Sequence, residues 1–149
     1  MTGIMRRIFG TGMAVAALAL VGCAEDMMGG SMAKFGATLN GASEVPALTV
    51  PGTGSATVTL DKSTKTLTWN VAYSGLTGPA RAAHFHGPAA AGTNATPVVP
   101  ITVSASPMVG SAQLTDAQIA DLMAGKWYVN IHTAANQGGE IRGQVGSAR

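Results

Sequence analysis

The sequence predicts an antiparallel β-sandwich or barrel of about eight short strands with one short helix near residues 115–124. Alanine, valine, threonine and glycine are frequent, and only 11% of the residues are charged, which suits a small β-rich fold. Many short segments alternate apolar and polar residues, as half-buried strands do. Turn-forming residues separate these segments at regular intervals, which is typical of sandwiches and barrels. A chain of 149 residues is long enough for one such domain.

The first part of the chain, residues 1–22, has the layout of a signal peptide. Arg6 and Arg7 form the charged region, and residues 8–20 form the apolar segment. That segment is shorter than the roughly 20 apolar residues of a comfortable membrane span. Both Met1 and Met5 are open as the true start, because a start at Met5 makes the charged region more compact.

Residues 20–23, Leu-Val-Gly-Cys, resemble the bacterial lipobox, whose cysteine is acylated and becomes the new N-terminus. We expect Cys23 to be lipidated and residues 23–33 to be a flexible tether. The resemblance implies a membrane-anchored lipoprotein of the bacterial cell envelope, periplasmic or surface-exposed, and at the outer membrane in a Gram-negative organism because Ala24 follows the cysteine. The alternative is an ordinary signal peptide followed by an incidental cysteine.

Charge and cysteine content exclude two further possibilities. Without Arg6 and Arg7, seven basic and seven acidic residues remain, so the mature chain is neutral. A neutral domain without Lys/Arg clusters argues against nucleic acid as a partner. Cys23 is the only cysteine, so the chain cannot form an internal disulfide.

Alternation predicts six strands before the helix, over residues 34–40, 53–61, 66–74, 81–87, 98–103 and 107–114. The second and third are expected to form a hairpin around the polar turn at 61–65. Pro46 and Pro51 bracket a loop after the first strand, because proline cannot donate to a sheet ladder. Gly110 indicates a bulge in the sixth strand.

The one expected helix begins at Thr115 as its cap, and Gln118 completes a capping box. Ile119, Leu122 and Met123 recur at helical spacing, and Gly125 ends the helix. We expect this helix to cover an open end of the sandwich.

The last predicted hairpin, residues 127–145, has two chemically distinct faces. Alternation places Trp127, Val129 and Ile131 toward the core, together with Ile141 and Val145 from the second strand. The opposite face carries six polar side chains, which are Tyr128, Asn130, His132, Glu140, Arg142 and Gln144. Imidazole, amide, carboxylate and guanidinium groups on one face indicate an organised polar network.

Several blocks together resemble the CHRD family, named after chordin and also found in bacterial proteins. They are Leu39-Asn40-Gly41 with Glu44-Val45-Pro46, Gly54-Ser55-Ala56, Leu67 and Trp69 with Tyr73-Ser74-Gly75-Leu76, Ala83-His84-Phe85-His86-Gly87-Pro88, residues 125–133 and residues 138–144. The resemblance covers residues 34–145, and we place the domain at 34–147. Gln137 departs from the family, which tends to have proline there.

The resemblance implies an immunoglobulin-like, Greek-key β-sandwich with distant similarity to copper/zinc superoxide dismutase. It implies no settled molecular activity.

The chain's three histidines form the strongest candidate site. His84 and His86 share one face of their strand, and His132 lies on the polar face of the last hairpin. If the two strands are neighbours, the three imidazoles converge and suit copper or zinc. Glu140 or Asn130 could then be a fourth ligand or a supporting group.

The alternative is a hydrogen-bond network without metal, made by Tyr128, Asn130, Glu140, Arg142 and Gln144 around the histidines. Arg142 is a poor neighbour for a cation, since like charges repel, and it could instead pair with a carboxylate such as Glu44. Both readings are open at this point.

The sequence offers no constellation for hydrolysis or phosphate binding. A copper/zinc dismutase centre needs more than three histidines and an aspartate, so we do not expect that activity. We expect a lipid-anchored, non-enzymatic envelope protein that acts as a binding or structural module for a protein or envelope partner. The alternative is a copper- or zinc-binding periplasmic protein that uses His84, His86 and His132.

Overall fold

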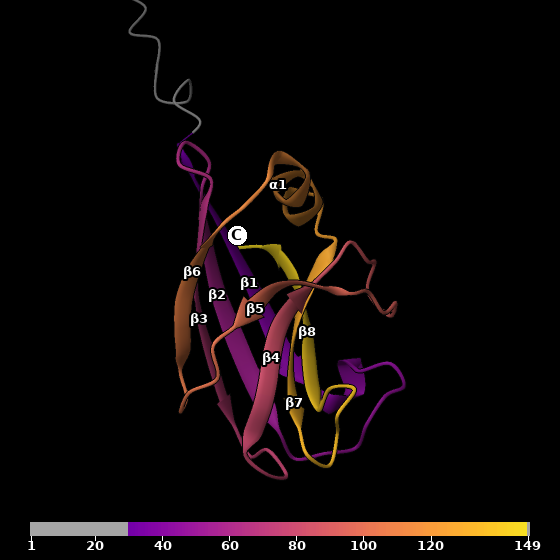
Figure 1. Cartoon of the computed structure of the whole chain (residues 1–149). Helices are drawn as coiled ribbons and strands as arrows, with labels where there is room; N and C mark the ends of the chain where they lie inside the picture. Colours follow the sequence, from indigo (N-terminus) through magenta and orange to yellow (C-terminus); the bar gives the residue numbers. More distant parts are fainter. Residues whose placement is uncertain (1–29, 149) are drawn as a thin grey trace, which may run out of the picture.

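The computed structural model describes residues 30–148, and the predicted signal peptide and Cys23 lie outside the described residues. Figure 1 shows the arrangement of the strands and of the helix. In order along the chain they are β1 (Met32–Asn40), the 3₁₀ turn η1 (Gly41–Ser43), β2 (Thr53–Asp61), β3 (Thr66–Ser74), β4 (Ala80–His86), β5 (Pro97–Ile101), β6 (Met108–Gln113), α1 (Asp116–Met123), β7 (Trp127–Thr133) and β8 (Ile141–Ser147).

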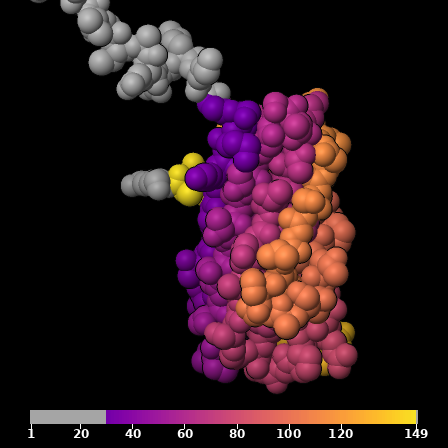
Figure 2. Space-filling model, turned by 90° about the vertical axis from the view of Figure 1, so that its left-hand side faces the viewer, coloured from indigo at the N-terminus to yellow at the C-terminus, as the bar shows by residue number. Residues whose placement is uncertain are grey.

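The eight strands form one antiparallel sheet in the order β5-β4-β7-β8-β1-β2-β3-β6. The sheet curls until its two edge strands, β5 and β6, approach each other, so the fold is nearly a barrel (Figure 1). Figure 2 looks onto this side, where orange β6 runs along the surface beside salmon-coloured residues near position 100. The predicted mainly-β, eight-stranded fold with one helix is confirmed.

Alternate side chains of the strands fill the interior of the curled sheet. Trp69 of β3 meets Phe85 of β4 edge to face, with ring centroids 5.5 Å apart, and Phe85 in turn contacts Trp127 of β7. Val58, Leu60, Leu67 and other apolar residues of the strands complete the core. Phe85 therefore points inward, and its neighbours His84 and His86 point to the outer face of the sheet.

The β2–β3 hairpin has the predicted bounds and an unbroken register from Thr53↔Ser74 to Asp61↔Thr66. The helix also forms as predicted, because Thr115 and Gln118 make a reciprocal capping box. Leu122 is fully buried, whereas Met123 is half exposed. Figure 1 shows α1 at one end of the sheet, over the opening between strands.

Two details differ from the sequence-based expectations. The predicted bulge at Gly110 is wrong, because β6 pairs with β3 in unbroken register through Trp69↔Gly110. Glycine is needed there for another reason: a Cβ atom would lie 2.6 Å from the Trp69 ring. In addition, β1 begins at Met32, so the last two residues of the expected tether belong to the sheet. Within the described residues, no helix is long and apolar enough to cross a membrane.

Candidate metal centre

The three histidines lie on neighbouring strands. β4 and β7 pair antiparallel, with Ala82 opposite His132 and His84 opposite Asn130. His132 is therefore diagonal to His84, and all three imidazoles project from the outer face of the sheet. One ring nitrogen from each histidine lies within 4.8 Å of the others, so the three side chains do converge.

The spacing of the nitrogens is close to that of a metal site. Nδ1 of His84 lies 3.2 Å from Nε2 of His132. Two nitrogens bound to one tetrahedral metal at about 2.0–2.1 Å lie about 3.3 Å apart. A ring nitrogen of His86 lies within 4.8 Å of one from each of the other two rings, so the three nitrogens surround one point on the sheet face.

Backbone carbonyls determine which nitrogens are free to bind a metal. Nδ1 of His86 lies 2.8 Å from the carbonyl oxygen of Ala95, and Nδ1 of His132 lies 2.9 Å from that of Gln137. A carbonyl oxygen only accepts, so Nδ1 carries the proton in both neutral rings. Nε2 of each ring therefore carries a lone pair, and that of His132 accepts a hydrogen bond from Nδ1 of His84 at 3.2 Å, a proton that a bound metal would replace. Carbonyl partners fix metal-binding histidines in the same way in known sites.

His86 differs from the other two histidines in its burial. His86 is 6% exposed, and its Nε2 atom is buried without any hydrogen-bond partner among the described residues. Burial lowers the pKa of His86, although the carbonyl of Ala95 and the adjacent side chain of Asn130 oppose this effect. Burial, followed by the neighbouring His132 and His86, also lowers the pKa of His84. Both rings thus favour the neutral form, which is the form that binds metals.

Asn130 lies between the histidines and the neighbouring β8 strand, and it is 2% exposed. Its Nδ2 is directed toward the carbonyl oxygen of Gly138, at 3.5 Å. Asn130 also affects Glu44: burial raises the pKa of Glu44, and hydrogen bonding with Asn130 partly opposes that rise. Its Oδ1 is buried without a partner. The cluster therefore contains two buried acceptors without donors, Nε2 of His86 and Oδ1 of Asn130.

Arg142 does not occupy the space between the histidines. Its guanidinium carbon lies 3.4 Å from the ring centroid of Tyr128, and the Tyr128 ring stacks on His86 with centroids 4.7 Å apart. Because the strand order is β4-β7-β8, Tyr128 separates Arg142 from His86. The guanidinium donates instead to Oδ1 of Asn94 and to the carbonyl oxygen of Thr93.

Glu140 is not close to being a metal ligand, because its carboxylate already accepts four hydrogen bonds. The donors are the backbone N–H and hydroxyl of Thr77, the hydroxyl of Thr133 and the amide of Asn136, at 2.6–3.0 Å. Burial alone would raise the pKa of Glu140, but these hydrogen bonds together lower it to about 2. Glu140 therefore ties the β3–β4 loop to β7 and to the β7–β8 loop.

The six polar side chains of the last hairpin thus form separate groups instead of one network. Gln144 donates to the carbonyl oxygens of Ala89 and Gly125 and holds those two segments together.

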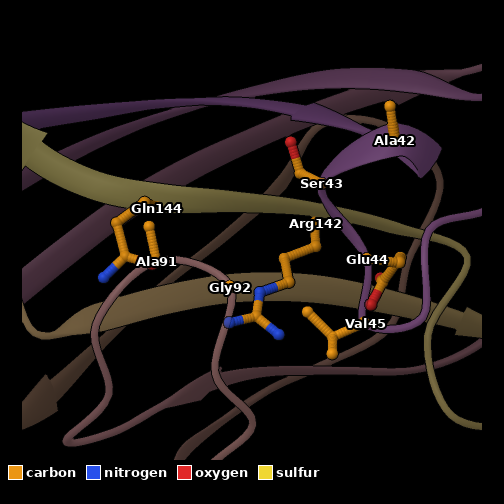
Figure 3. A pocket seen from close by; sticks show the side chains of 8 residues that line it. All are labelled: Ala42, Ser43, Glu44, Val45, Ala91, Gly92, Arg142 and Gln144. Carbon is orange, nitrogen blue, oxygen red and sulfur yellow. The ribbon is translucent and has the colours of Figure 1, made fainter.

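Arg142 extends into a surface hollow of about 280 Å³, beside Glu44 and Val45 (Figure 3). Burial raises the pKa of Glu44 to about 7 against the opposing charge of Arg142. Arg142 and Glu44 do not form an ion pair within 4 Å. The ion pair among the described residues is that of Lys65 with Asp116.

Sequence reasoning missed the groups that orient the histidines. Ala95 and Gln137 act through their carbonyl oxygens, which no side-chain pattern reveals. It also missed Thr77 of the β3–β4 loop and Asn136 of the β7–β8 loop, which donate hydrogen bonds to Glu140.

Fold and site together define a small antiparallel β domain with a three-histidine cluster on the outer face of its sheet. The family model of the CHRD domain matches residues 35–145, so the chain belongs to the CHRD family. Neither the comparison with curated proteins nor that with solved structures gave a match.

Proposed function

We propose that the domain binds one copper or zinc ion through ring nitrogens of His84, His86 and His132. The unpartnered, buried Nε2 of His86 carries this proposal. A buried acceptor without a donor costs roughly 1–3 kcal/mol. A metal ion at the cluster would satisfy this nitrogen, and imidazole nitrogens suit copper and zinc.

The other requirements of such a site are also met. The Ala95 and Gln137 carbonyls hold two of the rings in the tautomer whose Nε2 carries a lone pair and no proton. Oδ1 of Asn130 is a neighbouring acceptor that could support the ion through its bound water. Arg142 is separated from the cluster by the Tyr128 ring, so its charge repels the ion less than direct contact would.

The test is titration of the purified chain with Cu(II) and Zn(II) against a chromophoric chelator. We expect one ion per chain, and no binding of Mg²⁺, which prefers oxygen ligands. If the chain retains neither ion at one equivalent, the cluster is a hydrogen-bond network. The domain would then be a binding or structural module for a protein or envelope partner.

We further propose that the protein is a non-enzymatic lipoprotein of the bacterial envelope, anchored through Cys23. The support is the sequence of residues 1–23, with its charged start, apolar segment and lipobox-like end. Mass spectrometry of the membrane fraction tests it: diacylglycerol on an N-terminal Cys23 is expected. An unmodified cysteine, or cleavage elsewhere, would contradict it.

Tyr128 is expected to position His86 for metal binding. Its hydroxyl accepts from the N–H of Ala95 at 3.1 Å and donates to the carbonyl oxygen of Ala95 at 3.2 Å, the oxygen that also holds His86. Tyr128→Phe keeps the stacked ring but releases this loop, so metal affinity should fall about tenfold. Competition titration measures the change.

Tyr73→Phe is the matched control, because its hydroxyl also donates to a carbonyl oxygen, that of Ser104, away from the cluster. It should leave the affinity unchanged. Equal affinities for the Tyr128 and Tyr73 variants would show that the Tyr128 hydroxyl does not position the site.

A further inference from the structure

A surface cavity of about 350 Å³ reaches the histidine cluster from one side. His84 and His132 form part of its wall, together with Arg81, Ala82, Thr133, Ala134 and Gln137. His86 does not line it, because this residue lies deeper under the loop that contains Ala95. An ion held by the three histidines would therefore have the cavity on its His84–His132 side.

Protein groups occupy the opposite side of the cluster. The Tyr128 ring stacks on His86, and Asn130 is 2% exposed next to both. The Ala95 segment is fixed over His86 by hydrogen bonds from both rings. Additional ligands from solvent can therefore approach such an ion through the cavity and not through the packed side.

Arg81 gives this cavity a positive wall. By simple alternation Arg81 would point to the same face as Phe85, into the core. The register between β4 and β7 shifts between Ala80 and Ala82, and the shift leaves Arg81 unpaired in a bulge. Arg81 consequently lines the cavity together with His84, and no carboxylate lines it among the described residues.

We infer that an ion bound at His84, His86 and His132 keeps one coordination position open toward this cavity, where it takes a small anionic ligand. The inference rests on the proposed metal binding. Three nitrogen ligands leave at least one position of a four-coordinate copper or zinc ion to water or to an exogenous group. The positive charge of Arg81, a residue that lines the cavity, favours an anion in that position over a neutral molecule.

The experiment uses the purified chain loaded with one equivalent of Cu(II), and its probe is azide. A saturable azide-to-copper charge-transfer absorption band is expected. Arg81→Gln should weaken azide binding several-fold and leave the affinity for Cu(II) unchanged, since Arg81 is exposed and is not a proposed ligand. Binding of neutral imidazole to the loaded chain should be the same in both forms.

Each outcome separates the two proposals. A chain that binds no Cu(II) contradicts the proposed function itself. A chain that binds one Cu(II) but gives no azide band has a closed coordination shell, which overturns the open position alone. If azide binds equally to the loaded chain and to its Arg81→Gln variant, the preference for anions is wrong.

Discussion

His86→Ala should lower the affinity for Cu(II) and Zn(II) more than about 100-fold, a larger loss than removal of a supporting group produces. His86 is the most buried of the three histidines, and its ring is fixed by Ala95 on one side and by Tyr128 on its face. Loss of this ring leaves only the two half-buried histidines, which solvent can reach. Chelator competition measures the affinity of each variant.

Two further variants keep this result interpretable. His132→Ala removes a half-buried ring and should also weaken binding strongly, with less risk to the fold. Asn70→Ala, on the exposed face of β3, is the control and should bind as the parent chain does. Far-ultraviolet circular dichroism verifies that each variant is folded. Affinities within about threefold of the parent for both histidine variants would be inconsistent with the cluster as the site, because ligand loss costs far more.

Strands, turns and the helix could be predicted because each is encoded locally. The alternation of Leu67, Trp69 and Val71 gives β3 its bounds, and Thr115 with Gln118 gives the start of α1. The role of Gly110 could not be predicted, since it depends on the Trp69 ring of the neighbouring strand. A glycine in a strand is compatible both with a bulge and with close packing against an aromatic ring, and the sequence does not distinguish the two.

The histidine cluster was predictable only conditionally. The sequence places His84 and His86 on one face, but their distance from His132 depends on the pairing of β4 with β7 and on its register. The tautomers depend on the carbonyl oxygens of Ala95 and Gln137, which belong to loops. Loop conformation follows from the packing of the whole domain, so residue types alone cannot supply it.

Glu140→Gln should destabilise the domain by about 3 kcal/mol at neutral pH, the second large effect that we expect. The carboxylate accepts four hydrogen bonds while fully buried, and they lower the pKa of Glu140 to about 2 from an ordinary value of 4.5. A shift of one pKa unit corresponds to about 1.4 kcal/mol between the two protonation states. Glutamine keeps the shape of the side chain but loses the charge and one acceptor oxygen.

The contribution of Glu140 to the free energy of unfolding should depend on pH. A carboxyl with a lowered pKa in the folded state stabilises the fold above the pKa of the unfolded chain, and this contribution disappears as the pH falls toward the folded value. The difference in free energy of unfolding between parent and Glu140→Gln should therefore be full above pH 5 and about half as large at pH 3. Urea denaturation at several pH values measures it.

Glu44→Gln is the matched control, because Glu44 is also buried but burial raises its pKa to about 7. A raised carboxyl pKa has the opposite sign: its stabilising contribution is present below the unfolded pKa of about 4.5 and is lost as the pH rises through about 7. Glu44→Gln should thus gain stability relative to the parent as the pH rises from 5 to 8, while Glu140→Gln gains none. If both variants shift in the same direction over this range, the hydrogen bonds from Thr77, Thr133 and Asn136 do not hold Glu140 ionised.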